Sequence, residues 1–362
     1  MSTNEERRAE ARQRLREELD AQKKREKRTT MTVVAVASVI VLALVATGVT
    51  MKVRENIHEN QIAEKQQAWD DYRAQWAACD YAPSDDSQLT PVPDDQMAQA
   101  DEATKKQMED YNSKIEVAKK KKKDGKAPEG DQYKSGAVDV DLTTNNGDVD
   151  LSLDRAKAPC NVASFVGLVE QKYYDGTNCH RLTKTDPDQA AAQGGGLSVL
   201  QCGDPTGTGL GGPGYSVIDE APTGLAPAAD GQSVVYPRGT IAMAKSQQPN
   251  SAGSQFFLVY EDSTLPADYS VMGTIGEKGL ATLDKISKAG TKSDDPQSLD
   301  AEVPAKEVTI DKAVVGKEDT VPERPEAPEK PEGADAPAPD PAAGGGMPAG
   351  AGAPAGAGAA TQ

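Results

Sequence analysis

Aromatic side chains are scarce in this chain of 362 residues, which has 3 Phe, 2 Trp and 10 Tyr. All three phenylalanines lie between positions 165 and 257, whereas the last 42 residues contain 9 of the 24 prolines and 8 of the 33 glycines. A chain of this length could form about two or three domains, but so few large apolar rings do not supply a core for all of it. The composition therefore predicts one compact domain with flanks that fold poorly.

An excess of basic residues is also lacking. The chain has 40 Lys and Arg against 57 Asp and Glu, which makes the net charge −17 at pH 7. A phosphate backbone is bound by clustered Lys and Arg and would be repelled, on average, by this surface. The balance therefore argues against a nucleic-acid-binding protein and leaves room only for local basic patches.

Paired cysteines of the Cys-x-x-Cys type are absent, and the chain has only two histidines. The four cysteines are Cys79, Cys160, Cys179 and Cys202. In an oxidising compartment an even number of cysteines predicts two disulfides, and three pairings are possible. Zinc binding is the alternative, but His180 is the only histidine near these cysteines, so we expect disulfides and no metal.

Charged residues are missing from 29–51, a run of 23 positions whose middle is rich in Val, Leu, Ile and Ala. At about 1.5 Å per residue, a helix of this length crosses a hydrocarbon layer of roughly 30 Å. A buried core helix and a cleavable signal peptide are the alternatives. The apolar stretch exceeds the usual h-region of about 7–15 residues, and a charged leader of 28 residues precedes it. We therefore predict an uncleaved transmembrane helix.

The flanks of this segment differ in charge. Residues 9–28 carry eight Lys and Arg, whereas residues 52–71 carry three. The positive-inside rule then places residues 1–28 in the cytoplasm and everything after Met51 outside a cell membrane that the chain crosses once. Since the leader has a net charge of +3, the acidity belongs to the extracytoplasmic part.

Residues 52–135 are expected to form an extracytoplasmic stalk and linker. Within 55–78 the apolar residues Ile62, Trp69, Tyr72 and Trp76 recur at helical spacing. Such a stripe packs against its own domain or against a twin helix, so a stalk-mediated homodimer is one interpretation. The run of five lysines at 119–123 is interpreted as a solvated helix end or linker, with binding to an anionic envelope polymer as the alternative.

The composition changes at Gly136, where a folded block begins. Two stretches, 138–142 and 149–153, alternate apolar and polar residues around an Asn-Asn-Gly turn, which predicts a β-hairpin. Helices are expected from Pro159 to Val169 and over 280–288. Further strands are expected at 179–183, 199–203, 238–244, 255–260, 270–275 and 307–315. Eight short strands and two helices predict a mainly β protein, a closed antiparallel barrel capped by helices, over 136–316. Residues 317–362 are expected to be a disordered tail rich in Pro, Ala and Gly.

Five short strings in this block occur in the order seen in one family. They are Cys179-His180-Arg181-Leu182, Gln201-Cys202-Gly203-Asp204-Pro205-Thr206-Gly207-Thr208-Gly209, Gly211-Gly212-Pro213-Gly214-Tyr215, Ala242-Met243-Ala244 and Asn250-Ser251-Ala252-Gly253-Ser254-Gln255-Phe256-Phe257. The block resembles the cyclophilin-type peptidyl-prolyl cis-trans isomerases. The resemblance implies a cyclophilin-like eight-stranded barrel over about 136–315, and it does not extend to the stalk, the lysine run or the tail.

The resemblance also implies a reaction that needs no nucleophile, metal or cofactor. Rotation about an X-Pro bond crosses a barrier of about 18–20 kcal/mol because amide resonance is lost. A catalyst must hold the proline ring and donate hydrogen bonds that favour the twisted amide. By the resemblance, Arg181 is the catalytic donor and Gln201 holds substrate and arginine in place.

The other site residues follow from the same resemblance. Phe257 is expected to be the floor of the proline pocket. The other substrate-binding positions are expected to be Ala244, Val199, Leu265, Lys245, Tyr269, Met243 and Met272. Lys245 is expected to act through its backbone, and His180 is expected to be a structural hydrogen-bonding residue. Ser198 and Met272 stand where relatives often have phenylalanine, which predicts a wider or more polar pocket.

Neighbouring barrel strands in this family would bring Cys179 opposite Cys202, so the resemblance implies that disulfide. Cys160 would then pair with Cys79. We therefore expect a membrane-anchored isomerase of exported, unfolded or proline-containing polypeptides. A non-catalytic scaffold that holds proline-rich envelope proteins is the alternative: Arg181, Gln201 and Phe257 favour the enzyme, whereas the missing aromatics favour the scaffold.

Overall fold

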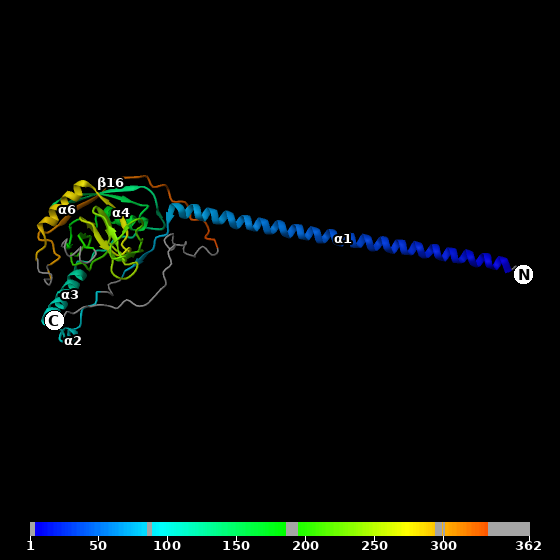
Figure 1. Ribbon diagram of the computed structural model, residues 1–362, viewed down its shortest axis with the longest axis horizontal. Helices are drawn as coiled ribbons and strands as arrows, with labels where there is room; N and C mark the ends of the chain where they lie inside the picture. The colour runs from blue at the N-terminus through cyan, green and yellow to red at the C-terminus, as the bar shows by residue number, and fades with distance from the viewer. Residues whose placement is uncertain (1–3, 85–88, 186–194, 294–298, 300, 332–362) are drawn as a thin grey trace. The chain divides into compact units, whose positions relative to one another are not determined.

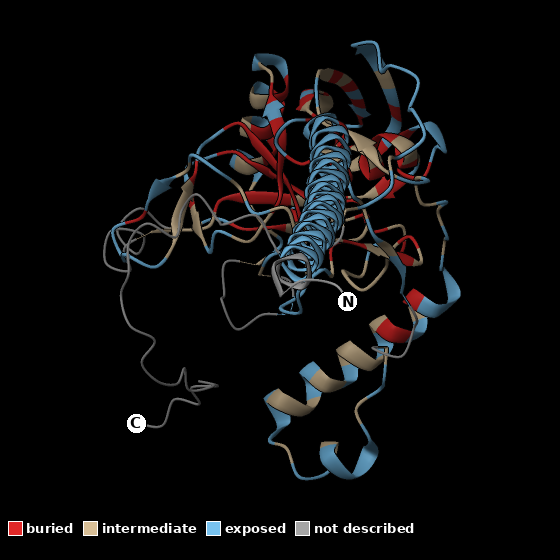
Figure 2. Ribbon diagram, turned by 90° about the vertical axis from the view of Figure 1, so that its right-hand side faces the viewer, coloured by how far each residue is buried: buried red, intermediate tan, exposed pale blue. Residues whose placement is uncertain are grey.

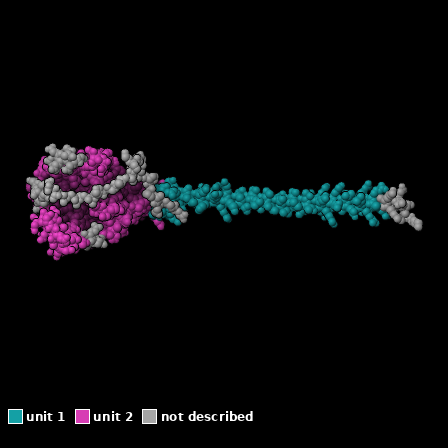
Figure 3. Space-filling model, turned by 60° about the horizontal axis from the view of Figure 1, so that its bottom comes forward, with its two compact units in different colours: residues 1–70, 327–362 teal, residues 71–326 magenta. Residues whose placement is uncertain are grey.

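The structure is a computed structural model that describes residues 4–84, 89–185, 195–293, 299 and 301–331. The chain divides into two compact units, which are coloured separately in Figure 3. One comprises residues 1–70 and 327–362, and the other comprises residues 71–326. The described part of the predicted tail ends at residue 331, so the prediction for 332–362 lies outside the described residues.

Helix α1 (Asn4–Gln75) runs without a break through the predicted membrane segment and stalk (Figure 1). It contains no proline and one glycine, Gly48, so nothing in its sequence interrupts the backbone hydrogen bonds. Hydroxyl groups in its apolar stretch donate to carbonyl oxygens one turn earlier, as Ser38 does to Val34 at 2.8 Å. This shields polar groups in a segment that is apolar on all sides. Among the described residues, α1 is the one helix long and apolar enough to cross a membrane.

The core of the second unit is a curled sheet of nine strands in which every neighbouring pair is antiparallel. The strands follow the order β6, β16, β4, β5, β15, β12, β13, β8, β7. Their bounds are Thr177–Asn178 (β6), Thr309–Glu318 (β16), Ala137–Thr144 (β4), Gly147–Asp154 (β5), Val271–Ile275 (β15), Thr240–Met243 (β12), Phe256–Val259 (β13), Val199–Cys202 (β8) and Arg181–Leu182 (β7). All eight expected strand regions contribute to this sheet. Its buried strands appear in red in Figure 2.

The predicted hairpin is present as β4 and β5, in which Thr144 pairs with Gly147 across a two-residue turn. Gly147 has a φ of +134°, a conformation that favours glycine. The expected strand at 179–183 is shorter than predicted, and a separate short strand precedes it. Only Arg181 and Leu182 pair with β8, while Thr177 and Asn178 pair with β16 at the opposite edge of the sheet. One short segment therefore supplies both edges, and the count of strands is nine rather than eight.

Two helices pack on this sheet. Helix α4 (Pro159–Glu170) begins with a proline at its first turn and buries Val162, Phe165 and Leu168 in the core. Helix α6 (Glu277–Ala289) lies on β5, where the backbone N–H of Gly279 donates to Asp150 Oδ1 at 2.7 Å. Both helices were expected, and both cover apolar side chains of the sheet.

Residues 71–135 also pack into the second unit, where a stalk and linker were expected. The added elements are β1 (Trp76–Ala77), β2 (Tyr81–Pro83), α2 (Asp94–Met97), α3 (Glu102–Lys120) and β3 (Gln132–Tyr133). Strand β1 pairs with β3, and β2 pairs with β9 (Tyr215–Val217). A further small sheet contains β10 (Ala226–Pro227), β11 (Val234–Tyr236) and β14 (Ser263–Leu265).

Two residues of the expected stalk stripe are buried within this unit. Tyr72 and Trp76 are 7% and 5% exposed, and the ring of Trp76 lies 5.3 Å from that of Tyr133. Trp76 also lies beyond the end of α1, in β1. These rings pack against their own domain, while Ile62 remains half-exposed on α1. A second copy of the helix could therefore not contact two of the four apolar residues of the stripe.

The start of the predicted tail is also held by the folded unit. Strand β16 continues to Glu318, two residues past the expected boundary, and Asp319 donates its backbone N–H to Ala137. Further along, Arg324 Nη1 donates to the carbonyl oxygens of Glu129 and Asp131 at 2.8 and 3.0 Å. Residues 317–319 are thus held by backbone hydrogen bonds of the sheet, so the expected tail begins later than residue 317.

Candidate active site

A row of five residues crosses five neighbouring strands on one face of the sheet. Arg181 pairs with Gln201, Gln201 with Phe257, Phe257 with Ala242, and Ala242 with Val271. Residues that face each other across antiparallel strands point to the same side, with Cβ atoms about 4.5–5.5 Å apart. The register therefore places the arginine, the glutamine and the phenylalanine side by side.

The guanidinium of Arg181 is held mainly by one carboxylate. Its Nε donates to Glu302 Oε2 at 2.6 Å and its Nη2 donates to Glu302 Oε1 at 3.1 Å. Nη1 reaches Gln201 Oε1 at a longer distance of 3.4 Å. Because the carboxylate occupies one edge of the planar fork, the other edge faces Gln201. The role of Glu302 was not predicted, since it lies 121 residues from Arg181 in sequence and outside every motif.

Gln201 connects this arginine to a glycine-rich loop. Its Nε2 donates to Gln255 Oε1 at 2.8 Å, and Gln255 Nε2 donates to the carbonyl oxygens of Gly209 and Gly211, both at 2.9 Å. The chain of hydrogen bonds fixes both amide orientations, because each amide must present oxygen on one side and nitrogen on the other. Gln255 belongs to one of the five motifs, but its role appears only in the structure.

Phe257 lies in an apolar cluster that is separate from the main core. Val199, Ala242, Val259, Val271 and Tyr236 are the other buried members, and Ala244, Leu265 and Tyr269 pack against them half-buried. The rings of Tyr236 and Tyr269 lie 6.3 and 5.7 Å from that of Phe257. Five predicted site residues, Phe257, Val199, Ala244, Leu265 and Tyr269, are thus brought together.

Tyr236 is the aromatic residue that the sequence interpretation missed. Its hydroxyl donates to the carbonyl oxygens of Pro266 and Tyr269 at 3.0 and 3.2 Å, so it fixes the segment that carries Tyr269. The Val-Val-Tyr sequence of β11 is a strand pattern that would have been the available signal. The cluster contains the rings of Phe257, Tyr236 and Tyr269. It therefore has more aromatic side chains than the lack of phenylalanine at positions 198 and 272 implied.

Met243 and Met272 lie on the other face of the sheet. Both are fully buried in the main core, while their neighbours Ala242 and Val271 belong to the cluster around Phe257. Side chains alternate between the two faces along a strand, so a position one residue away points in the opposite direction. The structure thus does not bring these two predicted binding residues to the cluster.

Ser198, where a pocket phenylalanine was expected in relatives, is buried and hydrogen-bonded. Its backbone N–H donates to Ser263 Oγ at 2.9 Å, and its hydroxyl donates to Glu261 Oε2 at 3.4 Å. The adjacent Leu197 packs against the apolar cluster. Through these hydrogen bonds, Ser198 connects the start of β8 to residues 261–263 at the edge of the cluster.

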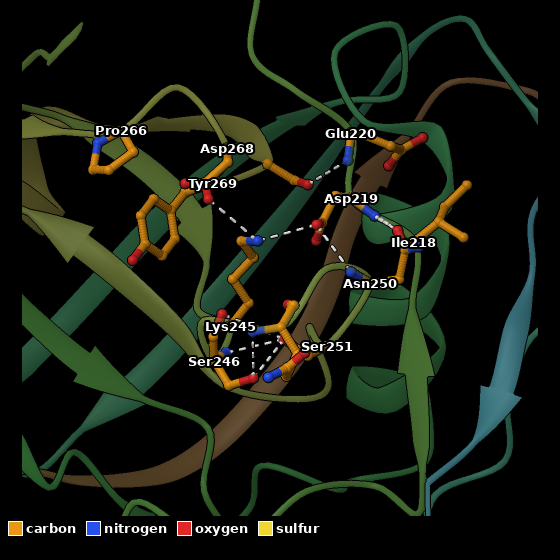
Figure 4. Close-up of polar contacts among 12 residues, drawn as sticks. Ile218, Asp219, Glu220, Lys245, Ser246, Asn250, Ser251, Pro266, Asp268 and Tyr269 are labelled. Carbon is orange, nitrogen blue, oxygen red and sulfur yellow. Dashed lines mark hydrogen bonds and ion pairs between the residues drawn. The ribbon is translucent and has the colours of Figure 1, made fainter. Parts of the chain in front are cut away.

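The side chain of Lys245 is buried between two aspartates, as Figure 4 shows. Its Nζ donates to Asp219 Oδ2 at 3.0 Å and lies 3.3 Å from Asp268 Oδ2, and only 6% of the side chain is exposed. Although burial opposes the charge, the two carboxylates raise the pKa of Lys245 overall. Since Asp268 precedes Tyr269, this lysine connects the segment after Ala244 to the segment that carries Tyr269.

The charge of Arg181 affects the pKa values of Tyr269 and His180. Burial raises the pKa of Tyr269, and the nearby Arg181 lowers it in part. Burial lowers the pKa of His180; the nearby Asp204 offsets part of this effect, and Arg181 lowers the pKa further. Among the described residues, His180 Nδ1 has no hydrogen-bond partner. The expectation that His180 is a structural hydrogen-bonding residue therefore finds no support at this atom.

Both expected disulfides are present, Cys79 with Cys160 and Cys179 with Cys202. The second one joins β8 to the residue two positions before Arg181, directly beside the row of site residues. Since all four sulfur atoms are oxidised, none is available as a thiolate ligand for a metal.

This arrangement places a cationic donor beside a wall of apolar and aromatic side chains. The wall offers dispersion contacts to a compact apolar ring, and the guanidinium offers hydrogen bonds to a polar group next to that ring. None of these side chains needs to form a covalent bond for this. The geometry suits binding and conformational chemistry on a polypeptide.

Comparisons with known proteins point to one family. Residues 139–315 match the family described as cyclophilin type peptidyl-prolyl cis-trans isomerase/CLD. "Probable peptidyl-prolyl cis-trans isomerase B" of Mycobacterium tuberculosis H37Rv is 49% identical over 176 residues, which are 48% of this chain and 53% of that protein. The protein of the same name from Mycobacterium leprae is 49% identical over 177 residues, 48% of this chain and 55% of that one. The chain thus spans about half the length of these two relatives.

A shorter relative is covered more fully. "Peptidyl-prolyl cis-trans isomerase A" of Dickeya dadantii is 33% identical over 182 residues, which are 49% of this chain and 83% of that protein. Among solved structures, a cyclophilin type peptidyl-prolyl cis-trans isomerase of Cryptosporidium parvum matches with 27% identity and a TM-score of 0.38, over 50% of this chain and 98% of that chain. On the sequence matches, the chain belongs to the cyclophilin-type peptidyl-prolyl cis-trans isomerase family.

Proposed function

We propose that this protein catalyses cis-trans isomerisation of X-Pro bonds in polypeptides. The observation that carries the proposal is the row formed by Arg181, Gln201 and Phe257 across β7, β8 and β13. Family membership supports it. Arg181 and Gln201 are the proposed catalytic residues, and Phe257, Val199, Ala244, Leu265 and Tyr269 are the proposed walls of the proline site. Ala242, Val271 and Tyr236 complete these walls.

The chemistry follows from the properties of a tertiary amide. At the top of the barrier of about 18–20 kcal/mol the nitrogen lone pair is no longer delocalised, so it accepts a hydrogen bond that the planar amide cannot. A donor that meets the twisted amide lowers the barrier, because it binds the transition state more tightly than the ground state. The guanidinium of Arg181 has five N–H donors and no acceptor, so it can only donate to the substrate. The apolar wall holds the ring while the chain before the proline rotates.

Arg181→Ala tests this proposal in a protease-coupled assay with a proline peptide and the full chain in detergent. Loss of a charged donor to the transition state predicts a fall in kcat/KM on the order of 100-fold. Arg324→Ala is a matched control, because Arg324 binds backbone carbonyl groups away from the site, and it should keep wild-type activity. Wild-type activity no greater than that of Arg181→Ala would defeat the proposal.

A proline-binding scaffold without turnover is the second candidate. The observation that favours it is the pair of hydrogen bonds from Arg181 to Glu302, which already occupy two of the five guanidinium donors. If the protein is such a scaffold, Arg181→Ala should bind proline peptides more weakly than wild type. Neither the wild-type protein nor the variant should then accelerate isomerisation.

We further propose that the catalytic unit is anchored in a membrane and acts on exported polypeptides. The apolar stretch of α1 and the two disulfides support export. Residues 1–28 would be cytoplasmic, 29–51 transmembrane and 136–316 the isomerase domain, with the lysine and arginine excess before residue 29 setting the orientation. The curled sheet would close into a barrel, because its two edge strands are β6 and β7 and only two residues of the chain separate them.

Labelling of single cysteines tests the orientation. Gln61→Cys should react with a membrane-impermeant maleimide in intact cells, whereas Gln13→Cys should react only after lysis. The native cysteines do not interfere, because all four form disulfides. The reverse pattern would overturn the proposed topology.

A further inference from the structure

Lys245 lies where three segments of the folded unit meet. It stands just after β12, and its Nζ lies 3.0 Å from Asp219 Oδ2 and 3.3 Å from Asp268 Oδ2 (Figure 4). Asp219 belongs to the segment after β9, and Asp268 belongs to the segment after β14. A buried ammonium group needs such carboxylate partners, because burial of an unpaired charge is costly. The two ion pairs, here called the Lys245 bridge, therefore fix both segments relative to β12.

The Asp219 end of the bridge is held by backbone hydrogen bonds. Asp219 Oδ2 accepts from the backbone N–H of Asn250 at 2.9 Å, and the backbone N–H of Asp219 donates to Asn250 Oδ1 at 2.8 Å. The backbone N–H of the next residue, Glu220, donates to Ser270 Oγ at 2.9 Å, and Ser270 is 2% exposed. These hydrogen bonds restrict the carboxylate, so Asp219 gives the ammonium group a fixed anchor.

The Asp268 end of the bridge leads to the proposed proline site. Asp268 directly precedes Tyr269, and its side chain is 50% exposed. The hydroxyl of Tyr236 holds the backbone of the same segment through two carbonyl oxygens. Tyr236 thus restrains the backbone of this segment, and Lys245 restrains the acidic side chain within it. Both contacts fix where the Tyr269 ring can lie.

Tyr269 packs half-buried in the apolar cluster, where its ring lies 5.7 Å from that of Phe257 at an interplanar angle of 82°. Edge-on ring contacts of this kind depend on the mutual orientation of the rings. The charges of the bridge lie close enough to act on the phenol: burial raises its pKa, Asp268 raises it further and Lys245 lowers it. Since Asp268 and Tyr269 are neighbours in the chain, a displacement of Asp268 would move a ring in the wall of the proposed proline site.

We propose that Lys245 is a positioning residue for the proline site: through Asp268, its ammonium group holds the Tyr269 ring in the wall of that site. The proposal rests on the proposed function and concerns the same site. The family resemblance suggested a role only for the backbone of Lys245, whereas the bridge assigns one to its side chain. A wall contacts the proline ring in the ground state and in the transition state alike. Lys245 should therefore affect binding of the peptide more than the rate of its rotation.

Asp268→Asn tests the bridge with the least change to the fold, because it leaves the ion pair of Lys245 with Asp219. The full chain in detergent is measured with a neutral proline peptide, with Kd from fluorescence anisotropy and turnover from the protease-coupled assay. Loss of an ion pair with a half-exposed carboxylate predicts a rise of about three-fold in Kd and KM, while kcat changes little. A fall in kcat with unchanged Kd and KM would overturn the proposal.

Lys245→Met removes the cation that both carboxylates share and should raise Kd and KM more, by about ten-fold. Circular dichroism identifies a temperature at which every variant is folded, and the binding data are taken there. Lys278→Met is the matched control, since it removes one lysine from an exposed ion pair between α6 and Asp148, and it should bind the peptide as wild type does. An equal rise in Kd in both lysine variants would mean that net charge alone sets the affinity and would overturn the proposal. So would a wild-type Kd in both Lys245→Met and Asp268→Asn.

A double-mutant cycle with Tyr269→Ala decides whether the bridge acts through the ring. Once the ring is absent, Lys245→Met and Asp268→Asn should change Kd by less than about two-fold. An undiminished rise in Kd in the Tyr269→Ala background would mean that the bridge acts on the fold in general, and the positioning role would then be refuted. Wild-type protein that binds the peptide without turnover contradicts the proposed function, whereas the Kd values of the cycle still test the bridge.

Discussion

The contact between Glu302 and Arg181 leads to the sharpest prediction about catalysis. The Arg181 side chain is 35% exposed and carries about 2 kcal/mol of rotamer entropy, so it would sample many orientations without a partner. The two hydrogen bonds to Glu302 hold the guanidinium plane and leave the opposite edge toward Gln201. Glu302 is therefore expected to act as a positioning residue for Arg181, the proposed catalytic donor.

The magnitude follows from the geometry and the solvent exposure. A bidentate pair at 2.6 and 3.1 Å would be strong when buried, but the Glu302 side chain is 54% exposed and solvent screens the attraction. About 1 kcal/mol remains, which corresponds to a loss of about five-fold in kcat/KM for Glu302→Ala. Because the orientation matters at the transition state, the loss should appear mainly in kcat. Glu302→Gln keeps an acceptor oxygen and should lose less.

Steady-state kinetics with a neutral proline peptide measures the effect, at low salt and at about 1 M salt, where charges interact over roughly 3 Å only. The difference between wild type and Glu302→Ala should narrow at high salt. Glu170→Ala is the matched control, an exposed carboxylate at the end of α4. If Glu302→Ala is as active as wild type, the positioning argument fails. If it is more active, Glu302 competes with the substrate for Arg181.

Three further predictions concern stability. Replacing Cys79 and Cys160 by Ser opens a loop with a sequence separation of 81 and should lower the free energy of unfolding by about 4.5 kcal/mol, as measured in urea; an unchanged midpoint would contradict this. Burial lowers the pKa of His180 below that of the unfolded chain, so its contribution to stability is complete above about pH 6.5 and is lost as pH falls. His180→Gln should therefore show a smaller loss of stability between pH 7.5 and 5.5 than wild type, and equal losses would refute the assignment. Lys245→Met leaves two carboxylates without their cation and should lower the free energy of unfolding by about 2 to 3 kcal/mol. Adding Asp219→Asn should recover part of this loss. If the effects of the two substitutions simply add, the ion pair does not contribute as proposed.

Much of the fold could be predicted because its signals are local. The alternation of 138–142 and 149–153 around a two-residue turn specifies a hairpin, and β4 and β5 form it. The uncharged stretch at 29–51 specifies an apolar helix, which α1 contains. The order of five motifs indicated the family, and with it the pairing of Cys179 with Cys202.

The site was only partly predictable because its composition depends on register and on distant segments. Met272 was expected in the binding site, yet Val271 occupies that face, since a shift of one residue reverses the direction of a strand side chain. Tyr236 and Glu302 join the site from loops and strands that no local pattern connects to it.

The sequence by itself determined an apolar N-terminal helix and one folded block with few aromatics, and its five motifs indicated the family. The scarcity of aromatics proved misleading at one place, since the rings of Tyr236 and Tyr269 both lie against that of Phe257. Only the tertiary structure decided that residues 71–135 belong to the folded unit and that Lys245 meets Asp219 and Asp268 from other segments of the chain. Contacts between segments far apart in sequence depend on how complementary surfaces pack, and periodicity along the chain carries no information about that packing.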